Sequence, residues 1–328
     1  MSIRVVEELQ SNYEQLKREQ QWTLSKQLAY VLARGFVGST YPFSGELYQE
    51  TKQRLKSKLN LFNNFTSPVR ESIICLLMTH NQTSDQALDE LLYDYEQIVN
   101  GGFRRSQYTY FAAYLLQFTP TNQKVATIER GKEIYEAIRE RHPFLTGQED
   151  APIALSLAQN SQLQPFSVDA ISDCMEQFYV GMNRIGFAKG DELQFAAGTA
   201  VQLFQGYNES IIQEMAQIIE DFRDARLPFR RETYASIVFL TFLSTQKSLN
   251  FQRLLDLFDE ISETCQLGFY KNLRTSLAVS LFIGEELKEF SQEEIESLSL
   301  NMNFLIIQQE ISAMIATTAV VAASSSNN

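Results

Sequence analysis

The chain has 328 residues, about twice the roughly 150 that are typical of one domain. Hydrophobic residues make up 44% and charged residues 21%, a globular composition that excludes wholesale disorder. Its 28 basic and 40 acidic side chains leave a net charge of −12. Because nucleic acids and anionic lipid surfaces bind cationic proteins, we expect no nucleic-acid and no membrane partner.

The predicted elements are helical hairpins, beginning with an atypical pair over 5–34 and a second pair over 44–78. Further along, residues 88–99, 171–185 and 211–222 carry apolar side chains three and four positions apart, which is typical of amphipathic helices. Denser apolar runs begin at Tyr108, Leu193, Tyr234 and Ser276. Their Leu, Ala and Gln content and the lack of hairpin dipeptides favour helices over buried strands.

A short motif, Gly-Phe or Pro-Phe, recurs between the two helices of successive pairs. Its phenylalanines, which are 41, 43, 42 and 40 residues apart, are Phe103, Phe144, Phe187, Phe229 and Phe269. Phe65 is a degenerate earlier copy. Glycine closes a helix in the left-handed conformation and proline cannot continue one, so the motif is suited to a tight turn. We expect these phenylalanines to occupy equivalent, largely buried positions between adjacent hairpins.

Helix-start signals divide the chain into units of about 41 residues. Ser84, Ser167, Asn208 and the capping-box pattern Ser291-x-x-Glu294 each precede a first helix. Residues 304–323 are the most apolar stretch, but Gln308 to Glu310 interrupt it, so we expect a packed terminal helix and not a membrane span. The predicted units of the single domain are 1–43, 44–82, 83–124, 125–165, 166–206, 207–248 and 249–289, with a helical cap at 290–323 and a disordered tail at 324–328.

Stacking of these units completes the core, because two helices alone cannot bury their apolar faces. The second helix of each unit is apolar nearly all round and the first on one face only, which predicts an inner and an outer layer. Two all-α architectures fit. We favour an open α-solenoid of about seven helix-turn-helix repeats, and the alternative is a closed α/α toroid.

Several stretches are similar to motifs of a bacterial family known as domain of unknown function 4003. They are His142 to Gly147 with Asp150 to Leu155, Gly186 to Gly190 with Leu193 to Phe195, and Gln308-Gln309 with Ala313 to Ala316. The resemblance covers nearly the whole chain and implies a cytoplasmic bacterial protein. It carries no catalytic residues, since the family has none assigned.

The search for catalytic and metal-binding motifs is largely negative, and we expect no cofactor and no metal. His80 and His142 are the only histidines, and neither has a second ligand at helical spacing. No nucleophile elbow or phosphate loop is present. Cys75, Cys174 and Cys265 lie far apart, without a zinc or disulfide pattern, and the first two belong to apolar helical stripes.

Two constellations remain as candidates. The first is a set of basic residues that follow the turn phenylalanines: Arg104, Arg105, Lys189, Arg230, Arg231 and Lys271. They either complement the negative C-terminal ends of the first helices or form a groove edge that binds an acidic peptide. The second is a set of acidic residues at the starts of the second helices: Glu71, Glu149, Asp150, Asp191, Glu192 and Glu232. They either complement the positive N-terminal ends of these helices or act as the paired carboxylates of a hydrolase.

The leading functional hypothesis is a non-enzymatic helical scaffold that binds a protein or peptide, acidic if the basic groove is used. The alternative is an α/α-toroid hydrolase of the glycoside type that uses the carboxylates. The absence of a basic segment followed by an apolar one at the start of the chain and the three dispersed cysteines predict a cytoplasmic protein. Oligomeric state and partner identity stay open.

Overall fold

The computed structural model describes residues 5–20, 24–59, 65–268, 270–287 and 307. In these residues it contains helices and no strands. The α-helices are α1 Val5–Gln20, α2 Lys26–Arg34, α3 Gly45–Lys58, α4 Ser67–Thr79, α5 Asp85–Asn100, α6 Gln107–Leu116, α7 Lys124–Arg141, α8 Ala151–Gln159, α9 Val168–Arg184, α10 Asp191–Phe204, α11 Glu209–Asp224, α12 Tyr234–Gln246, α13 Phe251–Thr264 and α14 Lys271–Glu286. Short 3-10 helices are η1 Thr121–Gln123, η2 Gln148–Asp150, η3 Ser161–Leu163 and η4 Arg231–Thr233.

These helices form seven hairpins, which confirms the all-α helical repeat. The hairpins lie within the predicted units, except that α7 begins one residue early, at Lys124. Ser84, Ser167 and Asn208 are N-caps as predicted, and each side chain accepts a backbone N–H bond at 2.9 to 3.1 Å. The Ser291 capping box and most of the predicted cap and tail, 290–328, lie outside the described residues.

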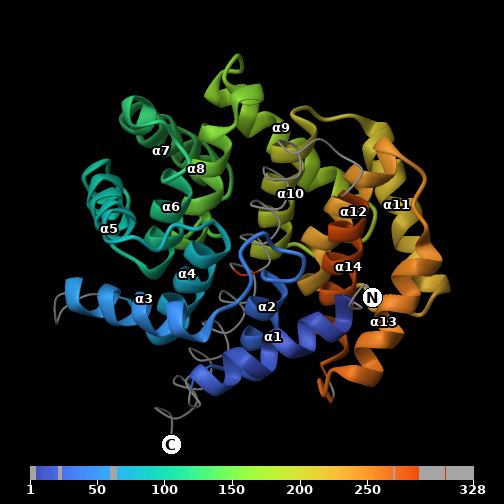
Figure 1. Cartoon of the computed structure of the whole chain (residues 1–328). Helices are drawn as coiled ribbons and strands as arrows, with labels where there is room; N and C mark the ends of the chain where they lie inside the picture. Colours follow the sequence, from blue (N-terminus) through green and yellow to red (C-terminus); the bar gives the residue numbers. More distant parts are fainter. Residues whose placement is uncertain (1–4, 21–23, 60–64, 269, 288–306, 308–328) are drawn as a thin grey trace, which may run out of the picture.

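The hairpins form a closed ring of two layers (Figure 1). Odd-numbered helices lie outside, and even-numbered helices lie inside with α2, the first inner helix, against α14, the last. Outer helix α1 also packs on α13. The Arg34 guanidinium donates to the Ser280 carbonyl, and the Lys26 ammonium donates to the Gln266 carbonyl. These contacts between the first and last hairpins identify the toroid alternative, and the preference for an open superhelix is corrected.

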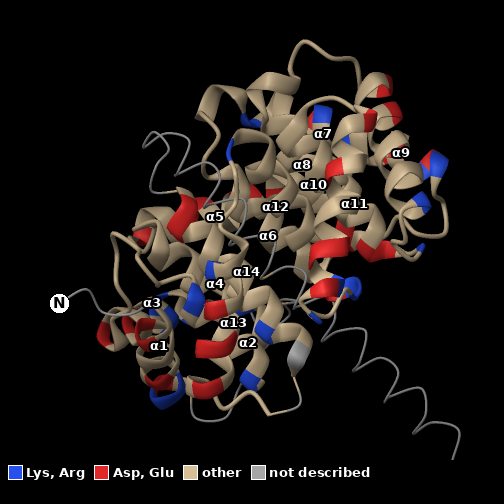
Figure 2. Cartoon of the chain, turned by 90° about the vertical axis from the view of Figure 1, so that its right-hand side faces the viewer, with Lys and Arg blue, Asp and Glu red and all other residues tan. Residues whose placement is uncertain are grey.

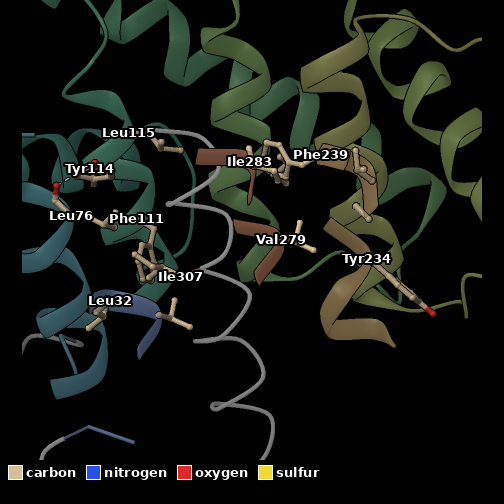
Figure 3. Packing of buried hydrophobic residues seen from close by; sticks show 14 of the residues in the cluster. Leu32, Leu76, Phe111, Tyr114, Leu115, Tyr234, Phe239, Val279, Ile283 and Ile307 are labelled. Atoms are coloured by element: carbon tan, nitrogen blue, oxygen red, sulfur yellow. Dashed lines mark hydrogen bonds between the residues drawn. The ribbon is translucent and has the colours of Figure 1, made fainter. Parts of the chain in front are cut away.

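Apolar side chains of the inner helices meet at the centre of the ring (Figure 3). Residues 151–158 of α8 are all buried, and so are residues 234–241 of α12, whereas α13 buries only Leu254, Leu257 and Ile261. Ile307, from the region predicted as the cap, is 2% exposed and lies beside Phe111. The inner and outer layers inferred from the apolar patterns are therefore present. No described helix is long and apolar enough to cross a membrane.

The turn phenylalanines divide into buried and exposed copies. Phe103 and Phe187 are buried, Phe229 is partly buried, and Phe269 lies outside the described residues. The prediction is wrong for Phe144, whose side chain is 99% exposed.

Backbone hydrogen bonds account for the difference between Phe187 and Phe144. Gly186 has φ +111°, and the following Phe187 N–H bonds back to the Met182 carbonyl at 3.1 Å, which directs this ring inward. Pro143, the equivalent of Gly186, lacks the N–H that Gly186 donates to the Asn183 carbonyl at 3.2 Å, and its ring excludes the positive φ of Gly186. After it, the chain turns on the His142 carbonyl, which accepts from Leu145 N–H at 3.0 Å, and Leu145 packs on the core in place of Phe144.

Candidate functional site

A cavity of about 540 Å³ opens at the ring edge where outer helices lead into inner helices. It lies between the α7–α8 connection, residues 142–150, and the end of α9 with the α9–α10 connection, residues 185–190. We call it the edge cavity. Its lining residues are Arg141, His142, Pro143, Phe144, Leu145, Glu176, Tyr179, Val180, Asn183, Lys189 and Gly190.

The rim of the edge cavity carries two exposed apolar side chains. Phe144 comes from the α7–α8 connection, and Val180, which is 55% exposed, comes from α9. Isolated apolar residues are common on protein surfaces, but two that border one concave surface resemble the anchors of binding sites. The rim therefore offers apolar area that the ring itself leaves uncovered.

The wall of the edge cavity holds a histidine–carboxylate pair. His142 Nε2 lies 2.6 Å from Glu176 Oε2, and the His142 ring packs on the Tyr179 ring with 4.6 Å between centroids. Arg141 Nε donates to Ser172 Oγ at 2.7 Å, and its guanidinium pairs with Asp173. These contacts join α7 to α9 and fix the orientation of the polar wall.

Behind this wall is a recess of about 10 Å³, room for roughly one water molecule. His142, Glu176, Tyr179 and Gln194 all line it. Gln194, from α10, is fully buried, and its Nε2 donates to Thr146 Oγ1 at 3.2 Å. Its Oε1 atom accepts no hydrogen bond from any residue that the structure describes. The recess thus contains a buried acceptor that a ligand donor or a water would satisfy.

An acidic cluster lies under the same edge, at the starts of α8 and α10. Burial raises the pKa of Asp150 to about 7, against hydrogen bonds from the Gln194 side chain and from Gly147 N–H, the latter at 2.9 Å. Burial also raises the pKa of Glu149 and of Asp191, with repulsion between these two carboxylates adding to the rise for Glu149. The ring therefore brings carboxyl groups together at the starts of α8 and α10, where burial favours their protonated forms.

The other predicted carboxylates are not part of this cluster. Glu71 is buried, forms ion pairs with Lys52 at 3.0 Å and Arg70 at 3.1 Å, and accepts a hydrogen bond from the Tyr48 hydroxyl. Glu192 pairs with Arg231, and Glu232 accepts from Asn272 Nδ2 at 3.4 Å. Among the described residues, no group of three or more His, Cys, Asp or Glu side chains has a metal-binding arrangement.

The predicted basic residues do not form one free stripe. Arg105 is bound by Glu96 at 2.7 and 2.6 Å, and Arg231 donates to Glu192 at 2.8 Å and to the Lys189 carbonyl at 3.0 Å. A groove edge for an acidic ligand requires cations that are free of ion pairs with these acidic residues, and Arg231 does not meet that requirement. On the side of the ring in Figure 2, acidic and basic positions are interspersed.

The remaining three described basic residues are exposed, and only one of them reaches the edge cavity. Arg104 and Lys189 are exposed, as is Arg230, whose guanidinium donates to the Phe229 carbonyl at 3.4 Å. Lys189 lines the edge cavity. The side chain of Lys271 lies outside the described part of the chain.

Sequence reasoning missed most of the cavity. His142 and Gln194 appeared within the motifs of the family resemblance, Phe144 was expected in the core, and Glu176 and Tyr179 carried no motif. One partial signal was the proline of His142-Pro143-Phe144, which removes the glycine N–H used at Gly102 and Gly186, although Phe229 after Pro228 still packs on the core. A second was the spacing of Glu176, Tyr179 and Asn183, which puts them on one face of α9.

Comparisons with known proteins identify relatives without a described activity. The chain is similar to the "Uncharacterized protein YeaA" of Bacillus subtilis (strain 168), with 23% identity over 284 residues, 85% of this chain and 84% of that protein. No solved structure matches the chain. The family model described as "Protein of unknown function (DUF4003)" matches residues 12–324, and the chain therefore belongs to this family.

Proposed function

We propose that this protein is a non-enzymatic helical scaffold that binds a peptide segment of a partner protein at the edge cavity. The observation that carries the proposal is Phe144, an aromatic ring 99% exposed beside a concave surface of about 540 Å³. Exposed aromatic anchors at a pocket are frequent hot spots of protein recognition. The bacterial cytoplasm is the proposed compartment, in keeping with the dispersed cysteines.

The surrounding scaffold supports recognition by a preformed site. The cavity is held by two hairpins whose inner helices α8 and α10 are buried in the ring. His142, Glu176 and Tyr179 are oriented by contacts between α7 and α9. A site fixed in this way loses little conformational entropy when a peptide binds.

A capture experiment with matched variants tests this function. Wild-type protein, Phe144→Ala and Tyr93→Ala are immobilised and exposed to bacterial cytoplasmic extract, and the retained proteins are quantified by mass spectrometry. Tyr93, which lies on α5 and is 62% exposed, controls for loss of an exposed aromatic ring. We expect proteins that bind wild type and Tyr93→Ala but are lost with Phe144→Ala. Identical sets for all three proteins would contradict the proposal.

A hydrolase remains the second candidate, because the ring brings Glu149, Asp150 and Asp191 together and burial raises the pKa of each of them. A protonated and an ionised carboxyl group are the pair that glycoside hydrolysis uses. Chromogenic glycosides with wild type and Asp150→Asn test it. Turnover abolished by the substitution would favour the hydrolase, and no turnover with any substrate would exclude it for those glycosides.

A further inference from the structure

We propose that the edge cavity recognises a basic side chain, lysine or arginine, of the bound peptide. This inference rests on the proposed peptide-binding function and names the group that the site selects. It differs from the acidic partner expected from the basic turn residues, two of which, Arg105 and Arg231, are held by ion pairs with Glu96 and Glu192.

The walls of the edge cavity suit a cationic side chain with an apolar stem. Phe144 and Tyr179 both line the cavity. Aromatic faces attract ammonium and guanidinium groups, and the contact strengthens where water is excluded. The methylene stem of a lysine or arginine would cover the exposed Phe144 and Val180 side chains, as such stems do on apolar surfaces.

One carboxylate acceptor lines the edge cavity, and an amide acceptor belongs to a residue that lines the recess. The Glu176 carboxylate lines both the edge cavity and the recess behind it, and it supplies a negative charge beside Tyr179. Gln194 is fully buried and lines the recess with its Oε1 atom unbonded by any described residue. Ammonium and guanidinium groups carry only donors, so one bound in the edge cavity would complement Glu176 directly and Gln194 Oε1 through a water in the recess, whereas a carboxylate ligand would face the Glu176 acceptor unpaired.

The charge beneath the cavity favours the same ligand. Glu149, Asp150 and Asp191 lie together at the starts of α8 and α10, and Gln194 bonds Asp150 while also lining the recess. Glu149 and Asp191 repel Asp150, and a cation bound in the edge cavity would offset part of that repulsion. Within the described residues this acidic cluster does not have a metal-binding arrangement.

Three residues with basic side chains also line the edge cavity, and one of them, His142, already contacts Glu176 Oε2 at 2.6 Å. Arg141 is neutralised by its pair with Asp173, and Lys189 is exposed, so that water and salt screen its charge. Gln194 is buried and therefore lies in a medium of lower dielectric constant, where an unmade hydrogen bond costs more. The balance therefore favours a basic ligand over an acidic one.

Titrations of the full chain with three capped tripeptides test the inference. The probes are acetyl-Ala-Arg-Ala-amide, acetyl-Ala-Met-Ala-amide and acetyl-Ala-Glu-Ala-amide, and binding is followed by NMR. We expect the arginine probe to bind at least about tenfold more tightly than the glutamate probe. Glu176→Gln, which keeps an oxygen for His142 but removes the charge, should weaken the arginine probe about tenfold. That loss corresponds to about 1.4 kcal/mol, near the value of one charge-assisted hydrogen bond.

The control is Glu220→Gln, a change of the same chemistry on α11, where Glu220 pairs with Arg223. It should leave the affinity of the arginine probe unchanged. Equal binding of the arginine and glutamate probes, no binding of the arginine probe, or full affinity in Glu176→Gln would overturn the inference. If the glutamate probe binds instead and Phe144→Ala abolishes that binding, the basic specificity fails while peptide binding stands. If Phe144→Ala alters neither probe binding nor protein capture, the proposed function fails as well.

Discussion

Phe187 and Phe144 occupy the same place in the repeat but opposite environments in the ring. Phe187 is 1% exposed and packs on Phe229 and Tyr234, with centroids 5.1 and 4.5 Å away. Phe144 is 99% exposed. The motif with glycine supplies a turn that buries its phenylalanine, whereas in the α7–α8 connection Leu145 takes the inward position. Because Leu145 packs on the core instead of Phe144, the Phe144 side chain is available for binding.

Among these substitutions, Phe187→Ala should reduce the free energy of unfolding most, and it tests the buried member of the comparison. Truncating a buried ring removes apolar contact and leaves a cavity, a loss of about 3 to 5 kcal/mol in the free energy of unfolding. The Tyr234 hydroxyl accepts from Ala188 N–H at 2.7 Å, so the substitution also loosens this turn. Denaturant unfolding measures the change. A loss below about 1 kcal/mol would show that the ring contributes little to packing.

Asp150→Asn tests the acidic end of the α7–α8 connection. Because the pKa of Asp150 is raised to about 7, from about 3.9 in the unfolded chain, the folded protein binds more protons between these pH values. Stability therefore falls as the pH rises from about 4 to 7. The asparagine variant should be more stable than wild type at pH 8, by about 2 to 4 kcal/mol, and the difference should shrink towards pH 4.

Unfolding curves of both proteins at several pH values check this expectation. Asparagine can still accept the Gly147 N–H bond, so the variant keeps the turn while removing the buried charge. If the variant is less stable than wild type at pH 8, the Asp150 carboxylate is stabilised by its donors and the acidic cluster is not strained.

The double substitution Arg230→Glu and Arg231→Glu, which reverses two charges in the α11–α12 connection, should change the free energy of unfolding only slightly. The Arg231 pair with Glu192 is solvent-exposed on both sides, and such pairs contribute about 0 to 1 kcal/mol. We expect a loss of roughly 1 kcal/mol or less that diminishes with added salt, measured by denaturant unfolding at two ionic strengths. Partner capture should persist. Lost capture in this variant with full capture by Phe144→Ala would move the binding surface to the basic turns.

Phe144→Ala should have the smallest effect on stability. A side chain that is 99% exposed buries no area in the free protein, and substitutions of this kind change the free energy of unfolding by about 0.5 kcal/mol or less. Thermal unfolding beside Phe187→Ala provides the measurement. A loss as large as that of Phe187→Ala would place the Phe144 ring in the core and remove the basis for the edge cavity.

Local features of the fold were predictable from the sequence, and long-range ones were not. The caps at Ser84 and Ser167 and the helix periods depend on contacts within a few residues, so pattern and capping rules locate them. Ring closure depends on the small rotation between hairpins summed over seven units. Its contacts, such as Arg34 with Ser280, join residues 246 positions apart, and no local pattern encodes that distance.

The candidate site was less predictable, for the same reason. The acidic cluster was foreseen in part, because Glu149, Asp150 and Asp191 occupy equivalent positions in adjacent units. The edge cavity was not, since Gln194 meets Glu176 and His142 only through the packing of α10 on α9 and of α9 on α7. Phe144 is exposed because the residue after it, Leu145, packs on the core in its place. The spacing of the repeats does not reveal this shift by one residue.

The central claim is that the Phe144 ring faces a binding site while its described repeat equivalents, Phe103, Phe187 and Phe229, pack on the core. Fluorine NMR of the full chain with a fluorinated phenylalanine in place of Phe144 tests it most directly. The account predicts a narrow, solvent-exposed resonance that shifts on addition of acetyl-Ala-Arg-Ala-amide, while the same label in place of Phe187 does not respond. A label at position 144 that is shielded from solvent, or that ignores the probe, would contradict the account.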